Sequence, residues 1–285
     1  MSKRSRRRWR ALVVLVICLA VVTAGAWVAS RFIDSSEILV REHCTAIVGT
    51  DSFRLAPDQA ANAALISAVS LDRGLPARAA SIGIATGFQE SKLRNIDYGD
   101  DAGPDSRGLF QQRPSQGWGS EEQVMDPVYA ANRFYQELEE LVPDFENLDI
   151  TVAAQRVQRS AFPDAYADHE PEGRAYASAL TGHSPAALNC VLKSPTEPGD
   201  AAGMSAALQD QLSSAQPQMS DDGRSATIPA SGTRGWALVQ WAVANADQFG
   251  ITSASFGGQG WVRVDHGWAP ATGTDGAVTV TFAGP

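Results

Sequence analysis

The residues best suited to chemistry lie between positions 77 and 119. The apolar segment 79–88 is predicted to be helical, and Glu90 follows it at the helix end. A loop rich in Gly and Asp comes next, and then a short apolar turn at 108–112. A carboxyl group packed against apolar neighbours has a raised pKa and keeps its proton near neutral pH. Glu90 is therefore a candidate general acid, whereas composition alone favours a solvated glutamate in the last helical turn.

Other common catalytic patterns do not occur in the sequence. It contains no HExxH, no CxxC pair, no P-loop and no GxSxG motif. The four histidines lie far apart and show no ligand spacing: His43, His169, His183 and His266. The sequence therefore predicts neither a metal centre nor a cofactor.

One pair of motifs carries a family resemblance. Glu90-Ser91, followed about twenty residues later by GLFQQ at 108–112, resembles the soluble lytic transglycosylase and goose-type lysozyme superfamily. Its members carry a Glu-Ser pair at a helix end and a Gly-Leu-(Met/Phe/Trp)-Gln element on the opposite wall of the cleft. The broader match, from Cys44 to Cys190, is similar to secreted or membrane-anchored lysozyme-like proteins of high-GC Gram-positive bacteria. The stretches that carry it are QESKLRNIDYGD, GLFQQRPSQGWG, DPVYAA and VQRSAFPDAY.

The resemblance, which covers about half of the chain, implies a role for several side chains. Glu90 would be the general acid that protonates the glycosidic oxygen. Gln111 or Gln112 matches the cleft glutamine of the family, which orients an acetamido group or the acid itself. The local sequence around Tyr166 departs from the family's Tyr-Asn pattern. The expected substrate-binding residues are Ser91, Gln111, Gln112, Trp118 and Tyr166.

The mechanism depends on whether a second carboxylate takes part. Inverting glycosidases hold two carboxyl groups about 6.5–9.5 Å apart, and retaining ones about 5–5.5 Å apart. Lytic transglycosylases need one glutamate, because the 6-hydroxyl of the substrate attacks the glycosyl centre. The loop aspartates are candidates for the second group, although such residues commonly hydrogen-bond their own turns. They are Asp97, Asp100, Asp101 and Asp105.

The expected function is cleavage of peptidoglycan. The bond cut would be the β-1,4 linkage between N-acetylmuramic acid and N-acetylglucosamine, by lytic transglycosylase or muramidase chemistry. The alternative is a non-catalytic cell-wall-binding or scaffold protein that keeps a lysozyme-like fold. Glycan strands are the expected partner in both cases, and other cell-envelope proteins are candidate partners.

Proline, glycine and apolar spacing predict the elements that position Glu90. Pro57 opens a helix that runs to about residue 72, and Pro76 starts the helix that ends near Glu90. A small β-ribbon is expected from residues 45–48 and 53–55. Three later helices are expected, one from residue 127, one at 151–160 and one at 173–180. Residues 44–190 are therefore expected to form a lysozyme-like helical catalytic domain, large enough to bury its own core.

The N-terminus predicts export. Residues 1–10 are basic and would stay in the cytoplasm, and 11–29 contain no charged residue. As a helix, 11–29 would be about 28 Å long and could span a bilayer, with 30–43 as a membrane-proximal segment. We therefore expect a single-pass protein of the cell membrane with an extracellular C-terminal part. The alternative is secretion after cleavage near Ala24-Gly25-Ala26.

The net charge argues against one class of partner, and the cysteines predict a disulfide. Six of the 23 Lys and Arg residues lie in the first ten positions, so the chain beyond residue 30 holds 17 basic against 32 acidic side chains and carries −15. This balance argues against nucleic acid as a partner. Outside the expected span, Cys44 and Cys190 form an even pair, which predicts one disulfide in an exported protein.

The C-terminal third is expected to be a separate module. Residues 191–232 are rich in Ser, Ala, Gln, Asp, Gly and Pro and predict a flexible linker. Residues 233–285 predict a helix and three strands, a small α+β module in which Trp261, His266 and Trp268 form either a sugar-stacking face or part of the core. The expected fold is thus mainly α, with one transmembrane helix before the lysozyme-like domain and the α+β module after it.

Overall fold

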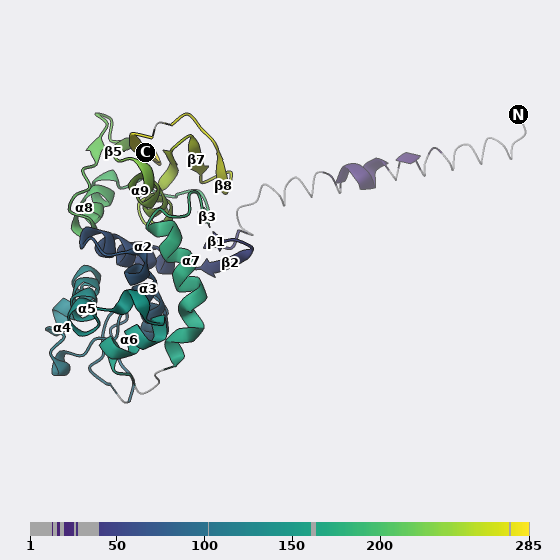
Figure 1. Cartoon of the computed structure of the whole chain (residues 1–285). Coiled ribbons are helices and arrows are strands. Elements are labelled where there is room, and N and C mark those ends of the chain that lie inside the picture. The colour runs from purple at the N-terminus through teal and green to yellow at the C-terminus, as the bar shows by residue number, and fades with distance from the viewer. Residues whose placement is uncertain are drawn as a thin grey trace, which may run out of the picture. The chain divides into compact units, whose positions relative to one another are not determined.

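The computed structural model describes residues 40–284 except 102, 161–163 and 274, together with Val13, Val16, Ile17, 20–25 and Trp27 (Figure 1). The chain divides into two compact units, Met1–Arg41 and Glu42–Pro285. The second unit carries every candidate site residue.

The predicted membrane anchor is not supported. Within the residues that the structure describes, no helix is long and apolar enough to cross a membrane. The longest described helical run in the predicted anchor is 20–25, whereas a span needs about 20 apolar residues. This finding corrects the anchor at 11–29 and the single-pass membrane location. The basic segment 1–10, most of 11–29 and residues 30–39 lie outside the described residues.

The predicted mainly-α class is also wrong. The structure is 46% helical and 18% strand, which makes it an α+β protein. Two antiparallel sheets carry the strands, one of three strands in the order β2-β1-β3 and one of six in the order β4-β5-β9-β6-β7-β8. The prediction underestimated the strand content because several strands are only two to five residues long.

The helical half contains the helices that the sequence predicted. The helices α2 and α3 start where expected. Pro57 is the first residue of α2, where no backbone N–H donor is needed, and Pro76 is the N-cap residue of α3. The helices are α2 (Pro57–Asp72), α3 (Ala77–Ser91), α4 (Glu121–Met125), α5 (Pro127–Leu141), α6 (Ile150–Gln158) and α7 (Glu170–Leu180), with the 3₁₀ turns η2 (Pro114–Gln116), η3 (Phe145–Asn147) and η4 (Ala165–His169).

Helix α3 is central to this half, and small residues let its neighbours approach it. A Cβ added to Gly83 would lie 2.6 Å from the Tyr135 hydroxyl of α5. A Cβ added to Gly173 of α7 would lie 2.9 Å from the carbonyl oxygen of Ser81. Both positions therefore require glycine, and the close packing holds the middle of α3 against α5 and α7.

The three-stranded sheet joins the two ends of the helical half, because β1 and β2 precede α2 and β3 follows α7. Its strands are β1 (His43–Val48), β2 (Asp51–Leu55) and β3 (Leu188–Val191). Cys44 and Cys190 are direct neighbours across the β1–β3 pair, and they form the predicted disulfide. Both cysteines are fully buried, so the disulfide lies inside the core.

The predicted flexible linker is folded. Residues 191–232 contain α8 (Ala201–Gln211), β4 (Gln218–Met219) and β5 (Ser225–Pro229). Helix α8 buries Met204 and Leu208 one turn apart, and β5 buries Ala226 and Ile228 on one face. The linker-like composition of 191–232 as a whole led to the prediction of a flexible segment. The remaining elements are α9 (Gly232–Ala244), β6 (Ile251–Phe256), β7 (Gln259–Val262), β8 (Gly267–Pro270) and β9 (Ala277–Phe282).

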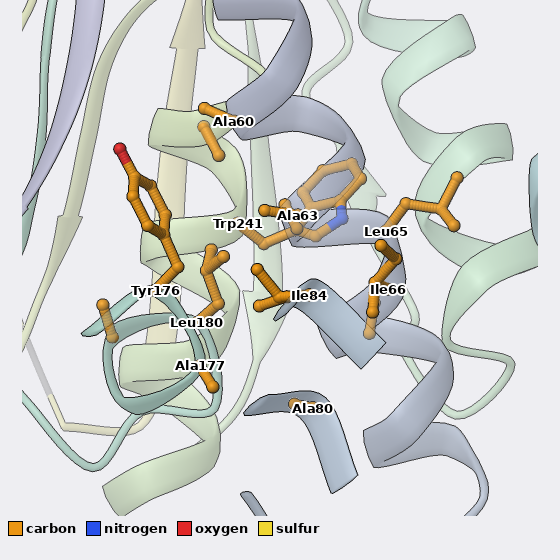
Figure 2. Packing of buried hydrophobic residues seen from close by; sticks show 14 of the residues in the cluster. Ala60, Ala63, Leu65, Ile66, Ala80, Ile84, Tyr176, Ala177, Leu180 and Trp241 are labelled. Atoms are coloured by element: carbon orange, nitrogen blue, oxygen red, sulfur yellow. The ribbon is translucent and has the colours of Figure 1, made fainter. Parts of the chain in front are cut away.

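The C-terminal third shares a core with the helical half. Figure 2 shows Ile66 of α2, Ile84 of α3, Leu180 of α7 and Trp241 of α9 in one apolar cluster. Because these helices meet side by side, residues 233–285 are not an independent module. Burial of large aromatic and aliphatic side chains contributes about 1.5–3 kcal/mol each, so the shared cluster stabilises both parts.

Gln240 of α9 joins the two halves by hydrogen bonds. Its side chain is fully buried. Its Oε1 accepts from the backbone N–H groups of Ala187 and Leu188, each at 2.8 Å. Its Nε2 donates to the carbonyl oxygen of Ala179 at 2.7 Å. One amide of the C-terminal third therefore satisfies backbone groups at the end of α7 and the start of β3.

The three aromatic candidates of the C-terminal third are arranged as core rather than as an exposed face. Trp261 is fully buried, and its indole N–H donates to the carbonyl oxygen of Cys190 at 3.2 Å. Trp268 is half-buried and donates to that of Leu188 at 2.7 Å. The carbonyl oxygen of His266 accepts from Asn189. These contacts fit the core alternative.

Candidate active site

Glu90 lies in the last turn of α3 and is half-buried. The hydroxyl of Tyr166, which is fully buried on η4, donates to Glu90 Oε1 at 2.6 Å. The side chain of Gln158, at the end of α6, also hydrogen-bonds Glu90. Three separate elements thus converge on one carboxyl group.

The surroundings of Glu90 favour its protonated form. Burial raises the pKa of Glu90 above its ordinary value, and the negative charge of Asp100 adds to this rise. The hydrogen bonds from Tyr166 and Gln158 lower the pKa, but burial has the larger effect. Burial, and then the charge of Glu90, raise the pKa of Tyr166, so its hydroxyl keeps the proton that it donates.

Gln158 is a site residue that the sequence did not single out. Besides its bond to Glu90, its Nε2 donates to the carbonyl oxygen of Phe110 at 2.9 Å. Gln158 therefore connects Glu90 to the Gly108–Gln112 turn. It belongs to the VQRSAFPDAY stretch, which was the only sequence signal for it.

Ser91 joins the helix end to the same turn. Its hydroxyl lies 2.8 Å from the carbonyl oxygen of Leu109 and 3.0 Å from that of Gly87, and it accepts from the backbone N–H of Arg94 at 3.1 Å. Ser91 is buried. Ser91 therefore makes contacts within the protein, and its contact with substrate stays a prediction.

The Gly108–Gln112 turn is compact and needs glycine at its first position. Gly108 has φ +78°, and a Cβ there would lie 2.2 Å from the carbonyl oxygen of Val124. Gln112 is buried, and its Nε2 donates to the carbonyl oxygen of Ala130 at 3.0 Å. Gln111 has φ 48° and is half-buried. Of the two predicted glutamines, Gln111 is thus the more accessible.

Trp118 lies beside α5. The guanidinium carbon of Arg133 lies 5.7 Å from the centre of its ring, and its carbonyl oxygen accepts from the Tyr129 hydroxyl at 3.2 Å. Trp118 is half-buried and packs against the core. Its described contacts therefore belong to the wall formed by α5, and they do not include Glu90.

The four loop aspartates differ in their hydrogen-bond and ion-pair partners. Asp105 accepts from the backbone N–H of Ser115 and pairs with Arg113 Nε at 2.8 Å. Hydrogen bonds from Ser115, and then the contact with Arg113, lower the pKa of Asp105. Asp100 accepts from the backbone N–H of Gly103 at 2.8 Å, and its charge acts on Glu90. Asp97, Asp100 and Asp101 are all exposed. Because its charge acts on Glu90, Asp100 is the best candidate for a second carboxylate.

His169 contacts side chains next to the site, on α3 and α7. Its Nδ1 lies 2.7 Å from Glu172 Oε1, and its Nε2 lies 3.1 Å from Gln89 Oε1. Its ring packs on Phe88, with 4.5 Å between the ring centres. These contacts hold η4, which carries Tyr166, against the end of α3. No spacing of metal ligands and no other pattern in the sequence pointed to this histidine.

Comparison with protein-family models and with curated proteins found no match to this chain. Among the residues that the structure describes, no three His, Cys, Asp or Glu side chains are grouped so that they could hold a metal ion. A protonated carboxyl held by a tyrosine and a glutamine can donate a proton, and as a carboxylate it can then accept one.

Proposed function

We propose that this protein cleaves the β-1,4 bond between N-acetylmuramic acid and N-acetylglucosamine in peptidoglycan. One observation carries the proposal: the half-buried carboxyl group of Glu90, with a raised pKa, bonded to Tyr166 and Gln158. A raised carboxyl pKa is what general acid catalysis of glycoside cleavage requires at neutral pH. The family resemblance of Glu90-Ser91 and GLFQQ points to the same bond.

In the proposed reaction, Glu90 gives its proton to the glycosidic oxygen as the C1–O bond breaks. The glycosyl unit develops positive charge at C1, and the leaving sugar departs as an alcohol. Glu90 is then a carboxylate and takes a proton from the attacking nucleophile, which restores the acid. Tyr166 and Gln158 hold the carboxyl group in place during both transfers.

Attack by the 6-hydroxyl of the substrate is the favoured second step. Asp105 is engaged by Arg113 and Ser115, and Asp100 is exposed and accepts from its own loop, whereas Glu90 is half-buried and has a raised pKa. A single acid/base is sufficient for the intramolecular reaction, which forms a 1,6-anhydro ring. Hydrolysis would instead need water and, in the usual two-carboxylate scheme, Asp100.

The expected products test this function. Purified peptidoglycan digested with the full chain should release muropeptides that end in 1,6-anhydro rings, detected by mass spectrometry as a loss of water relative to reducing ends. Reducing ends alone would indicate hydrolysis. Peptidoglycan without new ends of either kind, after prolonged digestion with folded protein, would contradict the proposal.

The proposed site of action is outside the cytoplasm. The buried Cys44–Cys190 disulfide supports this, because structural disulfides persist in oxidising compartments and are rare in the cytosol. The strongly acidic chain beyond residue 30 is also consistent with a substrate other than nucleic acid.

A non-catalytic cell-wall-binding protein is the second candidate. It is favoured by the burial of three of the predicted substrate-binding side chains, Ser91, Gln112 and Tyr166. Such a protein would sediment with insoluble peptidoglycan and release no fragments, and Glu90→Gln would leave its binding unchanged. Release of fragments that depends on Glu90 would exclude it.

Tyr166→Phe is expected to shift the pH dependence of cleavage. The Tyr166 hydrogen bond lowers the pKa of Glu90, so its removal lets burial raise that pKa further. Activity needs the protonated acid and falls as pH rises through this pKa. The alkaline limb of kcat/KM should therefore move to higher pH, whereas the exposed control Tyr98→Phe should not move it. An alkaline limb that stays in place would show that Tyr166 does not tune Glu90.

A further inference from the structure

A second candidate binding site lies where the helical half meets the C-terminal third. A cavity of about 350 Å³ is bounded by α2, the start of α5, α8 and the end of α9. Figure 1 shows α2 between α8 and α5. The volume falls at the small end of the range for small-molecule sites, about 300–1,000 Å³. The lining residues do not include Glu90, Tyr166 or Gln158.

Four amide side chains line this cavity, and hydrogen-bond partners fix the orientation of three of them. Gln211 Oε1 accepts from the indole N–H of Trp241 at 2.8 Å, and an indole can only donate. Asn245 Nδ2 donates to the carbonyl oxygen of Trp241, and Asn62 Nδ2 donates to that of Leu93, each at 2.8 Å. A carbonyl oxygen can only accept, so none of the three amides can be reversed without losing its bond.

These contacts leave a defined set of groups without a partner in the part of the chain that the structure describes. Gln211 keeps its NH₂ donor, and Asn245 and Asn62 keep their Oδ1 acceptors. None of these three groups is among the buried polar atoms of the described residues that lack a partner, so they are open to the cavity, where water can satisfy them. A ligand in the cavity would replace that water with hydrogen bonds of its own.

The lining also limits the charge of the ligand. Asp126 and Asp210 contribute carboxylates, and no Lys, Arg or His occurs among the described residues that line the cavity. A carboxylate or phosphate would be repelled there. Leu65 and Val128 add apolar surface. The carboxylates therefore disfavour an anionic ligand, and the amide groups and apolar surface match a neutral ligand with both donors and acceptors and with a small apolar part.

We infer that this cavity binds a neutral saccharide unit that carries hydroxyl and acetamido groups. The acetamido carbonyl or a hydroxyl oxygen accepts from Gln211, hydroxyl or amide hydrogens go to Asn245 and Asn62, and the methyl group meets the apolar wall. The choice of N-acetylglucosamine as the sugar rests on the proposed function. On a polymeric substrate the site would hold a glycan strand at a second point, separate from Glu90.

Trp241 offers a direct reporter for this site, since its indole N–H is bonded to Gln211. The experiment titrates the neutral N-acetylglucosamine trimer into ¹⁵N-labelled full chain carrying Glu90→Gln, which prevents cleavage. The Trp241 indole resonance, assigned with a Trp241→Phe variant, should shift and saturate. No shift at any trimer concentration would overturn the inference, as would a shift caused only by a stem tetrapeptide.

Two matched pairs of variants locate the binding. Gln211→Glu keeps the acceptor for Trp241 but replaces the NH₂ donor, and Ala207→Phe fills the cavity from α8. Each should weaken the affinity for the trimer, measured from the indole shift, by about tenfold or more, which is the effect of losing one good hydrogen bond. Gln209→Glu and Ala206→Phe make the same changes at exposed positions of α8 outside the cavity and should leave the affinity unchanged. Equal affinity in all four variants would overturn the inference.

The outcome is separable from that of the proposed function. Cleavage of peptidoglycan without an indole response would refute the second site and leave the function intact. A saturable response in a protein that releases no fragments would refute the cleavage and leave the saccharide site intact.

Discussion

Replacing Glu90 by glutamine is expected to abolish release of fragments from peptidoglycan. A positioned general acid typically accelerates a reaction by about 10²–10⁴-fold, and glutamine cannot donate the proton. The amide is nearly isosteric and can still accept from Tyr166 at the position of Oε1. The loss should therefore appear in kcat rather than in binding of the glycan. The measurement is the rate of formation of new glycan ends at saturating substrate.

The same variant should be more stable than the wild type at neutral and alkaline pH. Burial raises the pKa of Glu90 in the folded protein, so the folded state binds this proton more tightly than the unfolded state does. The stability contributed by Glu90 is present below its ordinary pKa and is lost as pH rises through the raised value. Glutamine does not ionise, so Glu90→Gln should gain on the wild type across that window, as measured by urea unfolding between acidic and alkaline pH.

A surface glutamate provides the control for both measurements. Glu122→Gln, at an exposed position of α4, should leave the cleavage rate and the pH dependence of stability unchanged. Full activity in Glu90→Gln would remove Glu90 from the mechanism. Loss of activity together with loss of the folded state would instead be detected by the urea transition, which separates the two causes.

Removing the disulfide is expected to cost the folded protein about 2–5 kcal/mol. Cys44 and Cys190 are neighbours on β1 and β3 and enclose the whole helical half, so their bond restricts a long loop in the unfolded chain. The double variant Cys44→Ala/Cys190→Ala should unfold at a lower urea concentration and with a steeper slope, because its unfolded chain is less compact and exposes more surface. A change below about 0.5 kcal/mol, within the range of ordinary surface substitutions, would contradict this account.

Reduced wild-type protein is the matched control for the double variant. It lacks the cross-link but keeps both sulfur atoms in the core, so its difference from the variant measures packing alone. Because both cysteines are fully buried, reductant added to the folded protein should act only after unfolding. The wild type should accordingly keep its oxidised stability when it is treated under native conditions.

The helices around Glu90 were predictable because local signals define them. Prolines at the starts of α2 and α3 and the alanine-rich apolar faces specify both their extent and their type. The contacts of Glu90 were less accessible, because Tyr166 and Gln158 lie far from it in the sequence. The resemblance pointed to Tyr166, whereas no pattern in the sequence selected Gln158 or His169.

The C-terminal third was mispredicted because its signals are weak locally. Helix α8 is rich in alanine and buries about one residue per turn, and β5 is five residues long. Their structure depends on partners elsewhere: β5 pairs with β9, and α8 packs on α2 and accepts the Trp241 indole through Gln211. Propensity cannot anticipate such pairing, which tertiary contacts decide.

The hydrogen bonds from Gln240 to the helical half tie the two parts of the protein to a single gene segment. The N–H groups of Ala187 and Leu188 and the carbonyl oxygen of Ala179 obtain partners from a helix some fifty to sixty residues later in the chain. A gene fragment that ended after β3 would encode a helical half with those groups unsatisfied and its share of the apolar cluster open to solvent. The two parts should therefore be gained or lost together, as one exchangeable unit.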